Sequence, residues 1–417
     1  MDLVKDYLYK TWNRLYILGR WMLLASISGI LIGLIAGLFG DSISFVSSFR
    51  NSHPWMLYLL PVFGIIIVFI YRFDKYHTNT NLVLEGIQKG KTVPLRMAPL
   101  IIISTILTHA GGGSAGREGA ALQLGGSIGS TIGKIAKLEE VDVKIMIMVG
   151  MSAAFSALFG TPLTATVFSM EVISVGIMQY AALVPCAFAA FAARDIAQLV
   201  GCYGEHFEIM GSVDFTVLAA TQIIFLAVCC AFVSIFFCFV LHKTEHIFHN
   251  YIKNPYLRIV VGSLCVIGLT LLLHTTDYLS TGMSVIERAI EGEASPYAFL
   301  LKMIFTTITL GCGFKGGEIV PTLFIGSTFG CLFGYCVGLS PSLCAACGMV
   351  ATFCGMTNCP LSSLFLAFEL FGFEYMPFFL FCIAIAYMES GYFGLYSSQK
   401  IMYSKTRLQF IDRHTND

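Results

Sequence analysis

Long apolar stretches recur along the whole chain of 417 residues, and they restrict it to a helical fold inside a membrane. A transmembrane helix needs about 20 apolar residues. Apolar residues make up 56% of the sequence and charged residues only 12%, which is roughly half the share found in soluble domains. This composition excludes a soluble globular enzyme, a disordered regulator and a secreted disulfide scaffold. The stretches are residues 22–40, 55–71, 98–109, 120–133, 144–175, 181–200, 215–241, 257–273, 298–313, 321–339, 345–371 and 376–396.

These stretches differ widely in length. Several are too short to cross a bilayer, and others, such as 144–175, are too long for one straight crossing. Glycine and proline interrupt many of them. Irregular backbone persists at membrane depth only where it is buried in protein or lines a cavity. The pattern therefore predicts broken helices around a buried polar path.

The sequence contains an internal repeat. The segment GRE at 116–118 matches GGE at 316–318, which lies 200 residues later. A second block repeats at an offset of 198 residues, where GMSAAFSALFGTP at 150–162 parallels GMVATFCGMTNCP at 348–360. In both copies a proline is followed nine residues later by a glutamate, Glu171 and Glu369. The chain is therefore expected to consist of two related halves.

The two halves are predicted to be residues 1–200 and 205–417. If each half crosses the membrane an odd number of times, the two are inverted relative to each other. Transporters built from inverted repeats bind their substrate near the membrane midplane, where broken helices of both halves meet. A substrate path between the halves is the expectation.

The two ends of the chain are basic. The first 21 residues are amphipathic and lack the features of a cleavable signal peptide, so we expect an interfacial helix that leads into the first span. Residues 397–417 are too few for a cytoplasmic regulatory domain. The positive-inside rule places both ends in the cytoplasm. The basic residues are Lys5, Lys10, Arg14, Arg20, Lys400, Lys405, Arg407 and Arg413.

The 14 cysteines lie scattered in apolar runs, where cysteine behaves as a small hydrophobic residue. One C-x-x-C pair, Cys344 and Cys347, has no second pair to complete a zinc site, so packing is the preferred interpretation and redox or metal binding the alternative. The formal net charge is zero, with no basic stripe for nucleic acid.

The glycine-rich segment GGGSAGREGAALQLGGSIGS at 111–130 precedes a predicted helix. Backbone N–H groups at a helix N-terminus attract anions, and glycine permits their close approach. The carboxylate of Glu118 can occupy such a site in place of the ion and leave it when protonated. We expect Glu118 to act as both gate and proton carrier, since acids inside membranes are generally functional. The alternative is a salt bridge to Arg117.

The matching segment GCGFKGGEIVP at 311–321 also opens an apolar run, with Pro321 in the first turn of the predicted helix. It carries an acid as well, Glu318. Two acids at equivalent places in two halves suggest a proton route through the middle of the protein. The alternative is that Glu318 pairs with Lys315.

A different class of protein, a membrane metalloenzyme, is suggested by the segment HKTEHIFH. His242, His246 and His249 lie at i, i+4 and i+7 on one helix face, with Glu245 beside them, and this spacing can hold a metal. The chain has only nine histidines, and the others form no second box. The segment ends an apolar helix, where basic groups complement the helix C-terminus, and this interpretation is preferred. No metal and no cofactor is expected.

Taken in order, these motifs resemble those of the CLC family of chloride channels and anion/proton antiporters. GREGA at 116–120 is similar to the family's G-R-E-G-P, and GGEIVP at 316–321 stands in place of G-G-x-F-x-P. FGTPLTATVFSME at 159–171 and LYS at 395–397 match two further family segments. The resemblance covers nearly all of residues 22–400. It implies an all-α polytopic membrane protein with inverted repeats and broken, tilted helices.

Three departures resemble the fluoride/proton antiporter clade of that family. The early G-S-G-I-P loop is absent, and Asn79 occupies the position of its serine. An acid, Glu318, follows the two glycines where chloride members carry an apolar residue. Val172 replaces the cytoplasmic-side proton glutamate that directly follows the structural glutamate, here Glu171, which is expected to pack or cap. Members of this clade export fluoride from bacteria.

The resemblance also implies the site. Glu118 and Glu318 are the predicted proton-linked acids. Fluoride is strongly hydrated, so its site must supply strong hydrogen-bond donors. An amide and a phenol provide such donors, but Asn81 competes with Asn79 and Tyr392 with Tyr396, and an asparagine here can also cap a turn. The predicted anion-binding residues are Asn79, Gly116, Arg117, Gly119, Gly317, Ile319, Val320 and Tyr396.

The predicted function is export of fluoride from the cytoplasm, driven by the inward proton gradient, across the inner membrane of a bacterium. Protonation of Glu118 from outside frees it to swing inward and exchange its proton against fluoride, with Glu318 assisting near the central ion. The resemblance implies a homodimer with one pathway per subunit. The alternative function is that of a chloride channel or chloride/proton antiporter, to which the same anion-site physics applies.

Overall fold

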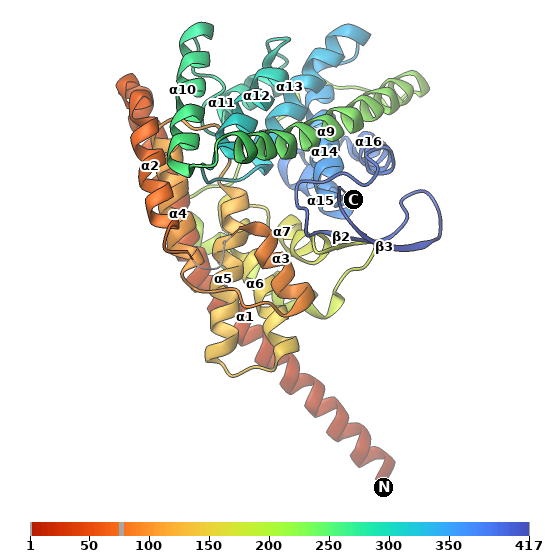
Figure 1. The fold of residues 1–417 in the computed structure, drawn as a ribbon. Helices are drawn as coiled ribbons and strands as arrows, with labels where there is room; N and C mark the ends of the chain where they lie inside the picture. The colour runs from red at the N-terminus through yellow and green to blue at the C-terminus, as the bar shows by residue number, and fades with distance from the viewer. Residues whose placement is uncertain (1, 75–78, 417) are drawn as a thin grey trace.

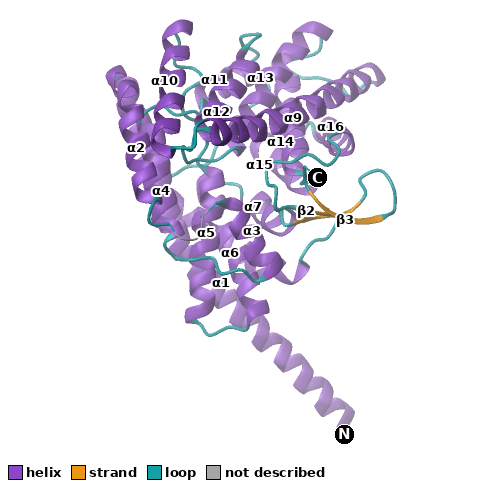
Figure 2. Cartoon of the chain, viewed as in Figure 1, coloured by secondary structure: helices purple, strands orange, loops and turns teal. Residues whose placement is uncertain are grey.

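The computed structural model describes residues 2–74 and 79–416, and this part is almost entirely helical (Figures 1 and 2). The predicted all-α polytopic fold is confirmed. The first half contains α1 (Asp2–Ser52), η1 (Pro54–Leu59), α2 (Leu60–Tyr71), α3 (Thr80–Lys89), α4 (Met97–Ala110), α5 (Glu118–Ile135), α6 (Glu140–Phe159), α7 (Pro162–Glu171), η2 (Tyr180–Ala182) and α8 (Leu183–Leu199).

The remaining helices follow Leu199. They are α9 (Val217–Tyr251), α10 (Pro255–Leu273), α11 (Met283–Ile290), α12 (Ala298–Gly311), α13 (Ile319–Val337), α14 (Pro341–Thr357), α15 (Pro360–Phe371) and α16 (Met376–Glu389). Three short strands, β1 (Ser174–Val175), β2 (Lys400–Tyr403) and β3 (Phe410–His414), form one sheet in that order.

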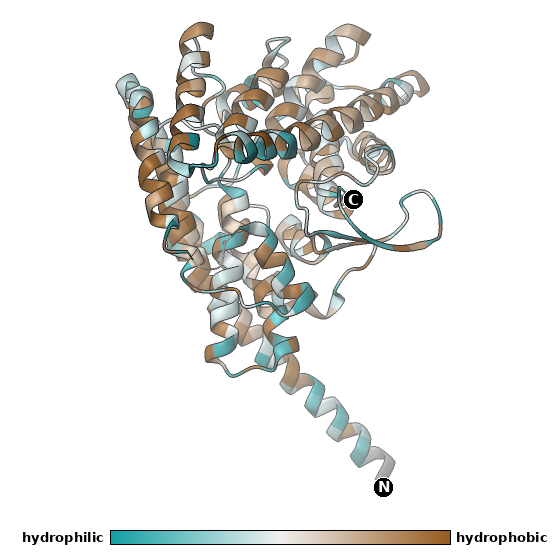
Figure 3. Cartoon of the chain, in the orientation of Figure 1, coloured by the Kyte–Doolittle hydropathy of each residue, from teal (hydrophilic) through white to brown (hydrophobic). Residues whose placement is uncertain are grey.

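Seven helices in the described part are long and apolar enough to cross a membrane, and five shorter helices are apolar as well. Figure 3 shows that apolar residues dominate most of these helices. The shorter ones, such as α7 and α15, are too short to span about 30 Å of hydrocarbon at 1.5 Å per residue. The expected mixture of full and broken crossings is therefore present.

The breaks fall where the sequence combines a turn residue with proline. The stretch 144–175 divides into α6 and α7 at Gly160, whose φ is +73°, and Pro162 then starts the next helix. The equivalent stretch 345–371 divides at Asn358, with φ +60°, and restarts at Pro360. Glycine and asparagine tolerate this left-handed conformation best, and proline suits the first turn of a helix.

Equivalent helices of the two halves pack alike. Helix α5 lies against α6, and α13 lies against α14. At the contacts the backbones touch: a Cβ on Gly125 would lie 2.0 Å from the carbonyl oxygen of Gly150, and one on Gly326 would lie 2.4 Å from that of Gly348. Small residues permit this close packing of helices in membranes. The sequence repeat thus has a counterpart in matching helix pairs.

The N-terminal segment is helical and leads into the first span. Residues 2–20 continue without a break into the first span, so α1 is one helix of 51 residues. Figure 1 shows its N-terminal part extending away from the rest of the protein. Trp21 and Met22 follow Arg20 directly and lead into the apolar run, with no proline or glycine pair between the polar and apolar parts, so nothing interrupts the helix.

Two glutamates, the buried Glu171 and the half-buried Glu369, tie the halves together. Glu171, at the end of α7, accepts hydrogen bonds from the backbone N–H groups of Leu361 and Ser362, at 3.1 and 2.8 Å, in the first turn of α15. Glu369, in α15, accepts bonds from the N–H groups of Leu163 and Thr164, both at 2.8 Å, in the first turn of α7. Each carboxylate caps the other helix, because the first N–H groups of a helix lack partners inside it.

The C-terminal strands hold the preceding loop in place. β1 pairs with β2 in parallel, and β2 pairs with β3 in antiparallel orientation. Beyond β3, the hydroxyl of Thr415 donates to the carbonyl of Tyr396 at 2.6 Å, and Asn416 N–H donates to the carbonyl of Tyr392. This sheet therefore fixes the loop that carries Tyr396.

Candidate functional site

The glycine-rich loops that precede α5 and α13 meet at the centre of the protein. Gly116 and Gly317 form an antiparallel bridge in which each N–H donates to the other carbonyl at 2.7 Å. A Cβ on Gly119 would lie 2.7 Å from the Cα of Gly317, so only glycine permits this approach. The two helix N-termini are therefore held together, and a pocket opens on each side of them.

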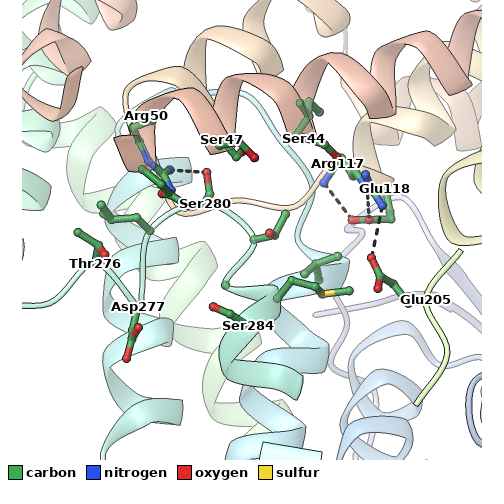
Figure 4. Close-up of a pocket in the computed structure, with 18 of the residues that line it drawn as sticks. Ser44, Ser47, Arg50, Arg117, Glu118, Glu205, Thr276, Asp277, Ser280 and Ser284 are labelled. Carbon is green, nitrogen blue, oxygen red and sulfur yellow. Dashed lines mark hydrogen bonds and ion pairs between the residues drawn. The ribbon is translucent and has the colours of Figure 1, made fainter. Parts of the chain in front are cut away.

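Glu118 lines the first of these pockets, which has a volume of about 350 Å³ and is called the Arg50 pocket here (Figure 4). Glu118 is 2% exposed, and its Oε2 accepts a hydrogen bond from the N–H of Arg117 at 2.9 Å. The guanidinium of Arg117 lies 3.3 Å from Oε1 of Glu118 and 3.9 Å from Glu205. The pair considered from the sequence is therefore formed, and it holds the carboxylate at the start of α5.

Glu205 lies in the loop after α8, outside the membrane-spanning helices. Burial raises the pKa of its carboxyl, while the nearby charge of Arg117 opposes this shift. Arg117 is thus shared between two acids that face the same pocket. The remaining wall carries many hydroxyl and amide groups, including those of Ser44, Ser47, Asn51, Thr276, Ser280 and Ser284.

Glu318 lines the second pocket, which has a volume of about 390 Å³ and is called the Tyr396 pocket here. Two buried polar atoms at this pocket have no hydrogen-bond partner: Oε2 of Glu318 and the hydroxyl of Tyr396. Buried polar groups are normally satisfied, so orphaned ones indicate a position that a ligand or water occupies. A small ion between these groups would meet both a hydroxyl donor and a carboxyl.

The alternative pairing of Lys315 with Glu318 is not formed. Its ammonium lies 4.8 Å from the ring centre of Tyr71, and the ion pairs within residues 2–74 and 79–416 do not include Glu318. Glu318 therefore keeps a free carboxyl oxygen toward the pocket. Lys315 lines the same pocket, so its charge remains close by.

The structure distinguishes the two asparagines geometrically. Asn81 uses its whole amide, which donates to Ser397 Oγ and accepts from Ser398 N–H, both at 3.0 Å, and so joins α3 to the Tyr396 loop. Asn79 caps α3 through its oxygen alone, which accepts from Leu82 N–H at 3.0 Å. Its side-chain N–H₂ group stays available, and the residue is exposed at the Tyr396 pocket.

The two tyrosines are separated in the same way. Tyr392 donates its hydroxyl to Ser404 at 3.1 Å, and Arg413 stacks on its ring. Tyr396 is 2% exposed and lines the pocket with an unpartnered hydroxyl. Tyr396 is thus the one of the two that can serve an ion in this pocket.

The remaining predicted anion ligands are backbone groups at the two helix starts. The N–H groups of Gly116 and Gly317 bond to each other's carbonyls in the bridge. These two residues therefore let the loops approach each other but offer no free N–H donor to an ion. Gly119 lies in the first turn of α5, and Ile319 and Val320 lie in the first turn of α13. Their N–H groups have no partner within the helix. Val320 also lines the Arg50 pocket, so the start of α13 reaches both sides.

The histidines of HKTEHIFH diverge to different partners. His242 Nε2 lies 3.1 Å from the carbonyl of Gly394, His246 contacts Asn250, and His249 contacts Arg258. In the described part of the chain no three His, Cys, Asp or Glu side chains gather as a possible metal group. His242 and Glu245 instead line the Tyr396 pocket, which the sequence analysis did not foresee. The sequence feature that could have indicated this placement is the cluster of polar residues at the end of an otherwise apolar helix.

The comparisons with known proteins agree with this geometry. The family model for voltage gated chloride channels matches residues 65–391. A chloride/fluoride channel protein of Pseudomonas syringae pv. tomato is 32% identical over 397 residues, covering 93% of this chain and 88% of the relative. The crystal structure of a CLC-type fluoride/proton antiporter superposes with a TM-score of 0.88 at 33% identity, covering 93% of this chain and 99% of that one.

A more distant structure shares the fold alone. It is the crystal structure of a slow cyanobacterial chloride/proton antiporter, with a TM-score of 0.77 at 19% identity. The match covers 89% of this chain and 94% of the antiporter chain. The architecture is therefore common to proteins whose described anions differ.

Proposed function

This chain belongs to the voltage-gated chloride channel family, called CLC, and on that premise we propose that it is a fluoride/proton antiporter. It exports fluoride from the cytoplasm and is driven by the inward proton gradient. The observation that carries this proposal is the placement of the Glu318 carboxyl beside the unpartnered hydroxyl of Tyr396 in one pocket. The names of the two similar proteins, a chloride/fluoride channel protein and a fluoride/proton antiporter, support it.

The chemistry of the pocket suits fluoride. A small, strongly hydrated anion loses strong hydrogen bonds to water on binding, and only well-placed donors replace them. The phenol of Tyr396, the amide of Asn79 and the N–H groups at the start of α13 are such donors. Fluoride is also the conjugate base of a weak acid, so a carboxyl that gains and loses a proton fits its transport better than that of chloride.

The two acids take different parts in the cycle. Deprotonated Glu118 occupies the anion path beside Arg117. Protonation from the Arg50 pocket neutralises Glu118, weakens its hold on the N–H and guanidinium groups, and lets it swing inward. Glu318 receives the proton on the other side while fluoride moves outward. Each carboxyl thus couples the loss of its charge to the passage of the ion.

The membrane orientation follows from the basic ends of the chain. Both termini lie in the cytoplasm, so the Arg50 pocket at the far end of α1 faces the outside and the Tyr396 pocket faces the cytoplasm. The two repeats, 1–200 and 205–417, are inverted relative to each other. The protein works as a homodimer, with one pathway per subunit, in the inner membrane of a bacterium.

The test is ion efflux from proteoliposomes, measured with fluoride and chloride electrodes in parallel, with and without a protonophore. Fluoride efflux coupled to opposite proton movement, with little chloride movement, is the expected result. Comparable chloride flux would assign the protein to chloride transport. Protein-free liposomes serve as the control for the leak of HF.

A further inference from the structure

Neither Val172 nor Glu171 can accept a proton from Glu318 on its way to the cytoplasm. Val172, directly after α7, is fully buried and carries no titratable group, and its carbonyl accepts a hydrogen bond from Gln399 at 2.9 Å. Both carboxyl oxygens of the preceding Glu171 cap α15. The Tyr396 pocket, which Glu318 itself lines, offers a proton on Glu318 another way out.

The Tyr396 pocket has a second carboxylate in its wall. Glu245 belongs to the polar end of α9, a helix of 35 residues that is about 52 Å long at 1.5 Å per residue and so exceeds the hydrocarbon thickness of about 30 Å. Figure 3 shows this hydrophilic end of α9. Glu245 is exposed, and its backbone N would lie 3.2 Å from a Cβ on Gly311, where the chain leads toward Glu318. The carboxylate thus connects the pocket to water.

We propose that Glu245 is the residue that takes the proton from Glu318 and releases it to the cytoplasm. This inference rests on the proposed antiport. The placement of both carboxyls in the wall of one pocket of about 390 Å³, which is large enough to admit water, is its geometric basis. The pocket thereby serves as the inner proton path as well as the inner mouth of the anion path.

The charge of Lys315 favours proton transfer from Glu318 to Glu245. Lys315 interacts electrostatically with both Glu245 and Glu318. In the transfer, the O–H bond of the Glu318 carboxyl breaks, its electron pair stays on that oxygen, and a new O–H bond forms on Glu245, directly or through water. The total charge of the two acids is unchanged, so Lys315 stabilises the remaining carboxylate before and after the step. Glu245 then gives the proton to bulk water.

Other charged groups surround this pair and set its electrostatics. Glu245 also interacts with Arg258 of α10 and with His249 on its own helix. Asp74 interacts with Lys315 from the segment after α2. The titratable and charged groups that line the pocket with Glu245 or interact with it are Lys315, Glu318, Tyr396, His242, His249 and Arg258.

The test compares Glu245→Gln, Glu245→Asp and wild type in proteoliposomes between pH 5.5 and 8, with proton uptake and fluoride efflux recorded together. We expect Glu245→Gln to slow coupled exchange roughly tenfold, because a positioned proton acceptor contributes at least this much. Glu245→Asp, which restores a carboxylate, should recover most of the rate. Fluoride affinity, measured by calorimetry, should stay the same in all three proteins.

The matched control is His246→Gln on the same helix, whose ring contacts Asn250 and is not part of the pocket wall. It should exchange like wild type. If Glu245→Gln exchanges fluoride and protons as fast as wild type, the inference is overturned and the antiport stands. Slowed exchange in Glu245→Gln with no recovery in Glu245→Asp also overturns it, since this result indicates a structural role. Absence of exchange in wild type overturns the antiport and the inference together.

Discussion

Gly116 and Gly317 exchange two backbone hydrogen bonds of 2.7 Å, one in each direction, across the centre of the protein. This bridge joins the two loops that begin α5 and α13. It also separates two acids, because Glu118 lines the Arg50 pocket and Glu318 lines the Tyr396 pocket. An ion that moves between the pockets has to pass the helix starts held by this bridge, where both acids are within reach.

Gly119→Ala should disrupt this centre. The added Cβ would lie 2.7 Å from the Cα of Gly317 and 3.1 Å from Oε2 of Glu318, so the loops must separate. We expect loss of fluoride transport and a stability loss of about 1–3 kcal/mol, as for overpacked cores. Thermal unfolding in detergent and fluoride efflux measure the two effects. Gly268→Ala, with no atom within 4 Å of its Cβ, should leave both unchanged.

Glu118→Gln should abolish proton coupling. The amide resembles a carboxyl that is permanently protonated, so it cannot carry a proton or compete with the ion as an anion. We expect fluoride to move passively without opposite proton uptake, recorded with a pH electrode beside the fluoride electrode. Fluoride-driven proton uptake that persists in this variant would refute the proposed cycle.

Tyr396→Phe should weaken fluoride binding. The variant removes the unpartnered hydroxyl at the pocket and keeps the ring. A hydrogen bond to a charged group contributes about 1.5–3 kcal/mol, so fluoride affinity should fall roughly 10- to 100-fold in calorimetry. Tyr392→Phe is the control, because that hydroxyl donates to Ser404 away from the pocket, and it should bind fluoride normally.

The asparagines provide a similar contrast with different readouts. Asn79→Asp keeps the oxygen that caps α3 and removes the N–H₂ group, so we expect weaker fluoride binding with little loss of stability. Asn81→Ala removes both bonds to the Tyr396 loop, so we expect a lower melting temperature. Calorimetry and thermal unfolding on the same two variants distinguish these effects. Equal fluoride affinity in Asn79→Asp and wild type would exclude Asn79 from the site.

Lys405 should give the protein a particular pH dependence of stability. It donates to Asn358 and Ser390, and burial lowers the pKa of its amine to about 8 from an ordinary value of 10.5. Between these values the unfolded chain binds more protons than the folded protein, so stability rises with pH. Compared with Lys405→Met, wild type should gain in melting temperature from pH 8 to pH 10. A difference that stays constant over this range would contradict the assignment.

Much of the architecture could be predicted from local patterns. The apolar stretches, the repeated GRE and GGE segments and the glycine-proline breaks near Gly160 and Pro162 each reflect short-range chemistry, which the sequence displays directly. The caps made by Glu171 and Glu369 could be anticipated only in part. The sequence indicates a buried acid that packs or caps, but not that each acid caps the helix of the other half.

Local sequence patterns predict the class of fold, a two-part plan and the acids at the starts of α5 and α13, because membrane insertion and helix initiation depend on neighbouring residues. Long-range packing sets which polar groups remain free. Asn79 and Asn81 have the same side chain. The amide of Asn81 is used by the loop it contacts, whereas the N–H₂ group of Asn79 stays open to the pocket. Glu245 and Glu318 lie 73 residues apart in the chain. They share a pocket only because α9 packs against the end of α12, a long-range contact that no local pattern encodes.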